Sequence, residues 1–181
     1  MAAPVHYTAE MVRALPDDGN RYETVHGELL VTPAPRMWHQ VVVERLHDAL
    51  KAYLLRHPEW YLFATAADVS WGAPDVLVQP DLFVVPIAEV RTLDWARLRH
   101  LELVVEVLSP TTARADRFTK RRLYQEMRVP ACWIVDGDEH FVEVWTPEAA
   151  LPIVERERVM WLPAGAKEPL ELSPPELFRP L

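Results

Sequence analysis

The chain has 181 residues, half of them hydrophobic, with one cysteine and a formal net charge of -8. This composition excludes an intrinsically disordered chain and predicts a single domain over residues 1–181, with enough residues for a hydrophobic core. The lone cysteine excludes an internal disulfide framework and is typical of a cytoplasmic protein. The negative net charge argues against indiscriminate binding of nucleic acid. The sequence shows neither a signal-peptide pattern nor an apolar run of the ~20 residues that span a membrane.

The predicted elements alternate between strands and helices, with turn residues between them. In chain order they are a helix over 7–15, hairpin strands at 21–25 and 28–32, a helix over 38–55, strands over 60–71, 76–86 and 101–108, a helix that follows a cap at 109–111 and ends near 129, strands at 131–136 and 140–145, and one strand at 155–161. This order is typical of an α+β or mixed α/β domain with one central mixed sheet flanked by helices. The hairpin at about 20–32 is an N-terminal extension, and the proline-rich tail at about 173–181 is expected to be extended.

Two of the apolar runs each carry one carboxylate, Asp81 in VLVQPDLFVVP and Glu106 in LELVVEV. The short connection between the runs predicts neighbouring antiparallel strands. A carboxylate in a buried strand needs a hydrogen-bonding partner or a metal, and hard oxygen ligands of this kind suit Mg²⁺. Each acid could instead end its strand and meet water or an arginine.

A basic segment follows the second run directly. Residues 113–128 hold six basic side chains against two acidic ones, which gives a confined positive face. Lys120 is one of three lysines in an arginine-rich chain, and helical spacing places it on one face with Asp116 and Tyr124. This lysine could contact a phosphate or an activated water, or it could form an ordinary solvated ion pair with Asp116.

Three further polar side chains are candidates for the same site. Glu44 and His39 lie in the first two turns of the helix over 38–55, and Asp68 alternates within the strand that precedes Asp81. Each has an ordinary alternative: Glu44 could pair on the helix surface, His39 could be a half-buried histidine, and Asp68 could face solvent. The sequence holds no glycine-rich phosphate loop, zinc-peptidase motif or serine-hydrolase motif.

Together, Pro80-Asp81, the run from Glu106 to Pro110, Lys120 and Tyr124 resemble the motif of the PD-(D/E)xK nuclease superfamily, and more narrowly the Uma-type putative restriction endonuclease family. The resemblance covers about residues 20–146. Its further matches are Tyr22-Glu23, Gly27-Glu28-Leu29, Pro33-Ala34-Pro35 before His39, and Trp133-Ile134-Val135-Asp136. The resemblance implies a restriction-endonuclease-like core, a divalent metal (Mg²⁺ or Mn²⁺) and hydrolysis of DNA phosphodiester bonds. The sequence departs from the motif at its last position, where Leu108 replaces the lysine.

The resemblance also assigns roles to residues. Asp81 and Glu106 would hold the metal, with the Val107 carbonyl as a further ligand. Lys120 would replace the missing lysine from the next helix, and Glu44 would fill the helical acid position. The remaining candidates are His39, Asp68 and Tyr124 as accessory groups, and Arg114, Arg117 and Arg121 as contacts to nucleic acid.

Three classes of function follow from these observations. The first is a metal-dependent DNA endonuclease, for which a homodimer is expected because cutting both strands of a duplex takes two active sites. The second is a catalytically silent nuclease-fold protein that binds nucleic acid or a protein partner. The third is a structural or regulatory subunit without a nucleic-acid role, which the negative net charge favours.

Overall fold

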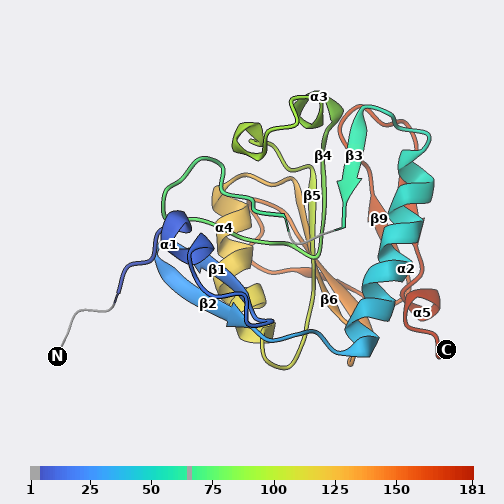
Figure 1. The fold of residues 1–181 in the computed structure, drawn as a ribbon. Helices are drawn as coiled ribbons and strands as arrows, with labels where there is room; N and C mark the ends of the chain where they lie inside the picture. Colours follow the sequence, from blue (N-terminus) through green and yellow to red (C-terminus); the bar gives the residue numbers. More distant parts are fainter. Residues whose placement is uncertain (1–4, 65–66) are drawn as a thin grey trace.

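A six-stranded sheet forms the centre of the computed structural model, which describes residues 5–64 and 67–181 (Figure 1). In spatial order its strands are β3 (Trp60–Phe63), β4 (Leu82–Pro86), β5 (Leu103–Val107), β6 (Ala131–Asp136), β7 (Phe141–Trp145) and β8 (Ile153–Glu155). Strands β5 and β6 are parallel, and the other neighbouring pairs are antiparallel. The predicted mixed central sheet is therefore confirmed.

Helices flank this sheet, with α4 and α2 on its two sides in Figure 1. The helical elements are α1 (Ala9–Arg13), α2 (Met37–Leu54), α3 (Ile87–Val90), the 3-10 turn η1 (Trp95–Arg97), the π-helical turn η2 (Ala115–Lys120), α4 (Arg121–Glu126) and α5 (Pro174–Leu177). The crossover between the parallel strands β5 and β6 runs through η2 and α4, as parallel neighbours require. Among residues 5–64 and 67–181, no helix combines the length and apolar character needed to cross a membrane.

The alternation of side chains along the strands divides the core into two layers. Val105 and Val107 of β5 pack with Leu46 in the layer on the α2 side. Val104 packs with Leu123 in the layer on the α4 side. Glu106 follows Val104 in this alternation, so its side chain points towards α4, away from α2.

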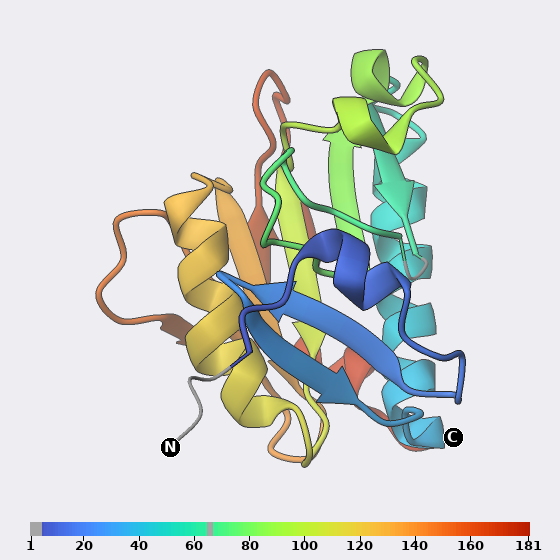
Figure 2. The same ribbon diagram turned by 60° about the vertical axis from the view of Figure 1, so that its left-hand side comes forward.

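A hairpin of β1 (Arg21–Val25) and β2 (Glu28–Thr32) forms a separate two-stranded sheet with the predicted bounds. Its two-residue turn, His26-Gly27, has φ angles of 50° and 80°, and such a turn needs positive φ at both central positions. Thr24 and Leu77 exchange two backbone hydrogen bonds of 2.8 Å, which dock the hairpin beside the segment that leads into β4. Figure 2 shows the docked hairpin in front of the sheet, between α4 and α2.

The predicted strand over 60–71 was too long, because β3 ends at Phe63. Residues 65 and 66 lie outside the described part of the chain. The predicted strand over 155–161 was also wrong, since a charged bend at 156–158 divides it into β8 and β9 (Val159–Trp161).

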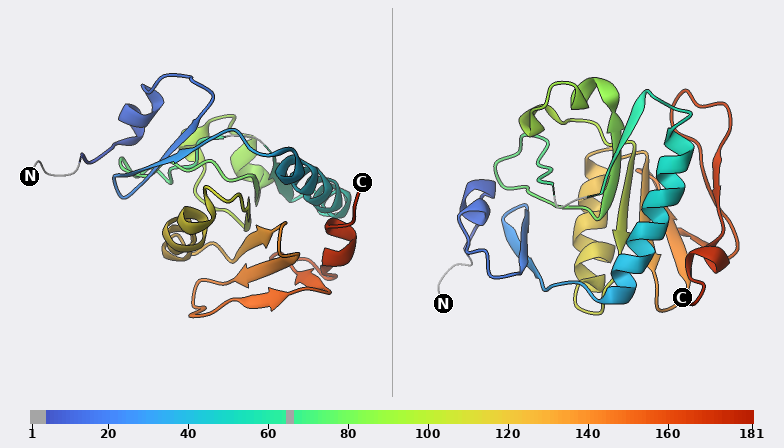
Figure 3. Two further views of the ribbon diagram at one scale, coloured as in Figure 1. Left: turned by 90° about the horizontal axis from the view of Figure 1, so that it is seen from below. Right: turned by 45° about the vertical axis from the view of Figure 1, so that its right-hand side comes forward.

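The sequence predicted an extended C-terminal tail, but part of the tail is helical. β9 pairs with β10 (Leu170–Leu172), and α5 follows, beside α2 in Figure 3. Helix α5 forms because the Ser173 side chain accepts a hydrogen bond from the Glu176 backbone and Pro174 occupies the first helical position. Phe178 is buried and stacks on His140, so the tail covers the core on the α2 side.

Candidate active site

Asp81 and Glu106 meet where β4 begins and β5 ends. The antiparallel register pairs Leu82 with Val105, which places Asp81, the residue before β4, at the level of Glu106. The Oδ2 atom of Asp81 accepts a 2.8 Å hydrogen bond from the backbone N–H of Val107. The predicted antiparallel arrangement of the two acidic segments is therefore confirmed.

Asp81 is held by two basic side chains from separate elements. Arg21 Nη1 donates to Oδ1 at 3.1 Å, and His39 Nε2 lies 3.2 Å from Oδ2. The start of α2, which carries His39, is fixed by Trp38, whose Nε1 donates to the Gly137 carbonyl at 3.0 Å. Burial works to raise the pKa of Asp81, but the hydrogen bond of His39 and the charge of Arg21 outweigh it and lower that pKa to about 2. Asp81 is therefore ionised at neutral pH.

Glu106 is buried on the α4 side of the sheet. Its Oε1 atom lies 2.7 Å from Lys120 Nζ, and the Tyr124 hydroxyl donates to the same oxygen. The exposed fractions are 1% for Glu106, 1% for Lys120 and 0% for Tyr124. The helix that follows β5 thus returns two long side chains to the end of that strand.

Lys120 bridges three carboxylates. Besides Glu106, its Nζ atom lies 3.0 Å from Glu23 Oε1 and 3.5 Å from Asp116 Oδ1. Glu23 Oε1 also accepts the backbone N–H of Gln79 at 2.7 Å. The alternative of a solvated pair between Lys120 and Asp116 is wrong, because both side chains are buried.

The helix that carries Lys120 contains the π turn η2 near its start, which the sequence did not predict. A turn wider than an α-helix keeps residues spaced four apart, Thr112, Asp116, Lys120 and Tyr124, on one buried face. Arg117 anchors this turn to the sheet through ion pairs of 2.8 Å to Asp136 and Glu143. Single π turns inside helices are frequent at functional sites.

The cluster around Lys120 holds more negative than positive charge. Among the described residues, ion pairs join four acidic side chains to two permanent cations, so acidic groups outnumber basic ones; the groups are Glu23, Asp81, Glu106, Asp116, Arg21 and Lys120. Burial raises the pKa of Glu106 to about 8 against the opposing charge of Lys120, and the neighbouring carboxylates add to the rise. Burial alone would lower the pKa of Lys120, but its three carboxylate partners outweigh burial and raise it.

A cleft of about 260 Å³ opens over Asp81. Its basic lining groups are Arg21 and His39, and its walls come from the segment after β2 and from the turn before η2, with Pro33, Pro35, Gln40, Ser109 and Thr112 among the lining residues. Glu106 and Lys120 do not line this cleft. The site therefore has an open end at Asp81 and a closed end at Glu106.

Several predicted residues lie away from this arrangement. Glu44 is exposed on α2, one turn beyond the cleft-lining Gln40. Asp68 accepts hydrogen bonds from Arg13 and Gln79, each at 2.9 Å. Leu108, at the position of the motif lysine, packs against the α4-side core.

The three arginines expected to contact nucleic acid differ in their surroundings. Arg117 is engaged by two carboxylates, as described above. Arg121 lies over the Trp145 ring at 4.3 Å and donates to Gln125. Arg114 is exposed at the start of η2. Two of the three guanidinium groups are therefore committed to contacts within the protein.

Sequence reasoning missed two charged residues of the site, Arg21 and Glu23, both on β1. They are two residues apart, so they point to the same side of the strand. The available signal was a pair of alternating charged residues in a hairpin strand, followed by a buried run. Only the docking of the hairpin through Thr24 reveals that this side faces Asp81 and Lys120.

The donor chemistry of the site fits a hard divalent cation. Mg²⁺ takes one or two carboxylates and completes its shell with carbonyls, waters and substrate oxygens, and Asp81 and Glu106 supply two carboxylates from neighbouring strands. Within the described ranges no group of three or more His, Cys, Asp or Glu side chains is arranged around one point as a metal site, so the fit rests on this carboxylate pair.

Comparison with known proteins identifies the family and the fold. The sequence profile of Uma2, a family described as "Putative restriction endonuclease", matches residues 9–177. A crystal structure described as a putative nuclease belonging to DUF820 from Anabaena variabilis ATCC 29413 superposes with a TM-score of 0.77 and 21% identity, over 95% of this chain and 97% of that chain. No curated protein matches the chain. The structural similarity confirms the predicted nuclease fold.

Proposed function

The chain belongs to the Uma2 family of putative restriction endonucleases, and we propose that it is a divalent-metal-dependent endonuclease that hydrolyses phosphodiester bonds in DNA. The observation that supports this most strongly is the convergence of Asp81, Glu106 and Lys120 from two strands and a helix. Lys120 Nζ lies 2.7 Å from Glu106 although the motif position after that strand holds Leu108. This distance supports the proposal that Lys120, from the following helix, takes the place of the motif lysine.

In this proposal Asp81 and Glu106 hold the metal, with the Val107 carbonyl as a further ligand. A bound Mg²⁺ or Mn²⁺ supplies an activated water and stabilises the charge that develops on the phosphate. Lys120 holds Glu106 in place and would orient the water or the phosphate through a hydrogen bond, and Tyr124 fixes the same carboxylate. His39 and the Val107 N–H orient Asp81 at the edge of the cleft.

The cleft over Asp81 is the proposed place for the DNA backbone. Arg21 and His39 line it, and Arg114, which is exposed just before η2, is the proposed further contact to DNA. Arg117 and Arg121 support the helix instead of the DNA. A homodimer would supply the second active site that double-strand cleavage takes, and a cytoplasmic location would give access to DNA.

A cleavage assay tests this proposal directly. Wild-type protein with Mg²⁺ or Mn²⁺ is expected to nick supercoiled plasmid, and chelation should abolish the nicking. Lys120→Ala should reduce the rate by about 10²-fold or more, the scale of losing one positioned contact in the transition state. Asp81→Asn should remove cleavage and metal binding together. Full activity of Asp81→Asn would refute the site.

One observation favours a second function, a catalytically silent nuclease-fold protein that binds nucleic acid. Burial raises the pKa of Glu106 to about 8, and a protonated carboxyl is a poor metal ligand. This candidate predicts DNA binding that weakens with salt, because phosphate contacts release counterions, and no cleavage with any divalent ion. Metal-dependent nicking would exclude it.

A further inference from the structure

Arg21 connects the open cleft to the buried carboxylates. Its Nη1 atom lies 3.1 Å from Asp81 Oδ1 and its Nε atom lies 3.8 Å from Glu23 Oε2. The Nε atom is buried and has no hydrogen-bond partner in the part of the chain that the structure describes. Arg21 therefore holds Asp81 by one hydrogen bond, whereas the strongest arginine–carboxylate pairs use two parallel ones.

We propose that Arg21 is an exchangeable counterion of Asp81, which neutralises this carboxylate in the metal-free protein and competes with a divalent metal ion for it. The inference rests on the proposed function, because it requires a metal at Asp81. In this inference Arg21, a residue outside the motif, sets the affinity of the site for its metal.

The contrast with Lys120 explains why Arg21 would be the cation that gives way. Lys120 is 1% exposed and contacts three carboxylates, so moving it would leave several buried charges unpaired. The Arg21 side chain is 22% exposed and lines the cleft of about 260 Å³, so its guanidinium has a solvated space to enter. Asp81 would keep the hydrogen bonds from His39 and the Val107 N–H after Arg21 leaves.

Electrostatic repulsion gives the direction of the effect. A divalent ion bound to Asp81 would be repelled by the permanent positive charge of Arg21, whose Nη1 atom lies 3.1 Å from the same carboxylate. Removing that charge should strengthen metal binding, since the ion no longer displaces a charge-assisted hydrogen bond. An arginine that only supports the fold predicts the opposite, because its loss would loosen Asp81 and weaken the metal site.

The test is a calorimetric titration of Mn²⁺ into metal-free protein. Arg21→Gln is expected to bind Mn²⁺ about 10- to 100-fold more tightly than wild type, and Arg21→Lys, which keeps the charge, should fall between them. The same variants report a second quantity, the melting temperature. Arg21→Gln should melt below wild type in chelator, and saturating Mn²⁺ should recover most of that difference.

Arg117→Gln is the matched control. Arg117 is 28% exposed and also pairs with buried carboxylates, but it does not contact Asp81. It should lower the melting temperature equally with and without Mn²⁺ and leave Mn²⁺ affinity within about twofold of wild type. Arg21→Lys serves for the affinity comparison should Arg21→Gln not fold.

The outcomes separate this inference from the proposed function. Mn²⁺ binding by wild type that Asp81→Asn abolishes, with unchanged or weaker binding by Arg21→Gln, would overturn the inference and leave the metal site standing. Absence of Mn²⁺ binding in both wild type and Arg21→Gln would overturn the proposed function and the inference together. Binding that becomes measurable only in Arg21→Gln would support the inference most directly.

Discussion

The two ends of the site shift the pKa values of their carboxylates in opposite directions. At the open end, Asp81 faces the cleft and its pKa is lowered to about 2. At the closed end, Glu106 is 1% exposed and its pKa is raised to about 8. Both acids lie beside a cation, so the presence of a cation does not explain the difference.

The surroundings of each cation explain it. Asp81 receives hydrogen bonds from Arg21, His39 and the Val107 N–H, and these stabilise the ionised form. Burial is the main cause of the raised pKa of Glu106, and Glu23 and Asp116, which share Lys120 with it, add negative charge that further opposes its ionisation. The open end therefore holds an ionised carboxylate, Asp81. The closed end holds more acidic groups than cations, and a metal ion would offset this imbalance.

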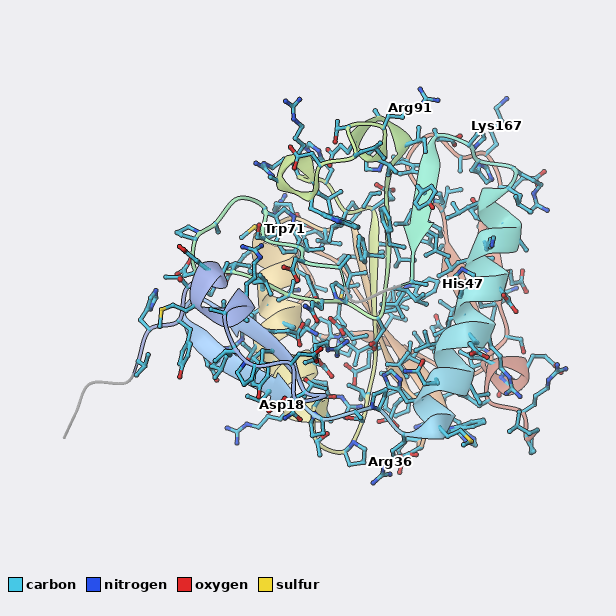
Figure 4. All side chains as sticks on the ribbon, in the orientation of Figure 1. Asp18, Arg36, His47, Trp71, Arg91 and Lys167 are labelled. Atoms are coloured by element: carbon cyan, nitrogen blue, oxygen red, sulfur yellow. The ribbon has the colours of Figure 1, made fainter. Side chains whose placement is uncertain are left out.

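The largest expected effect concerns the cation of the closed end. Lys120→Ala should reduce the free energy of unfolding by ~3–5 kcal/mol at pH 7, because it leaves three buried carboxylates without their common partner. Urea denaturation measures this loss. Lys167→Ala is the control, since Lys167 is an exposed lysine, labelled at the upper right of Figure 4. A loss below about 1 kcal/mol for Lys120→Ala would show that the closed end is solvated.

The open end should respond differently to the loss of its acid. Because the pKa of Asp81 falls from an ordinary 3.8 to about 2 on folding, its ionised form stabilises the protein by about 2 kcal/mol at neutral pH. This contribution is present above pH 3.8 and disappears as pH falls towards 2. Asp81→Asn should therefore unfold more easily than wild type at pH 7, with a difference that shrinks at pH 3. A difference independent of pH would contradict the lowered pKa.

The fold and half of the site follow from the sequence because they depend on local patterns. Asp81 and Glu106 interrupt apolar runs, and a short connection makes such runs antiparallel neighbours. Lys120 could be placed because a helix leaving β5 must return over that strand. These inferences need only the alternation of strands and the spacing of a helix.

Arg21 and Glu23 could not be placed in this way. Their hairpin is a separate sheet, and its position depends on the contact between Thr24 and Leu77, more than 50 residues apart. Nothing in the hairpin itself distinguishes this docking from an exposed hairpin. The π turn η2 also escaped prediction, because its anchors, Asp136 and Glu143, come from strands that follow it in the chain.

Replacing the acid of the closed end should give the opposite sign to Asp81→Asn. Between pH 4.5 and about 8 the folded protein keeps a proton on Glu106 that the unfolded chain loses, so this group makes wild type less stable as pH rises. Glu106→Gln lacks that dependence, so its free energy of unfolding should exceed that of wild type by at least about 1 kcal/mol at pH 8 and match it near pH 4.5. A variant less stable than wild type at pH 8 would show that Glu106 is ionised and well paired.

The smallest effect is expected at Glu44, which the family motif places in the site and the structure places outside both of its ends. The side chain is exposed on α2, one turn beyond Gln40. Glu44→Ala should change the free energy of unfolding by no more than ~0.5 kcal/mol, as is usual for surface positions, and should leave Mn²⁺ affinity unchanged. His39→Ala on the same helix is the comparison, since His39 is 9% exposed and contacts Asp81; it should weaken Mn²⁺ binding by removing a group that orients this carboxylate. Equal losses of Mn²⁺ affinity in the two variants would mean that α2 brings Glu44 to the metal, and that the open end is wider than the contacts of Asp81 show.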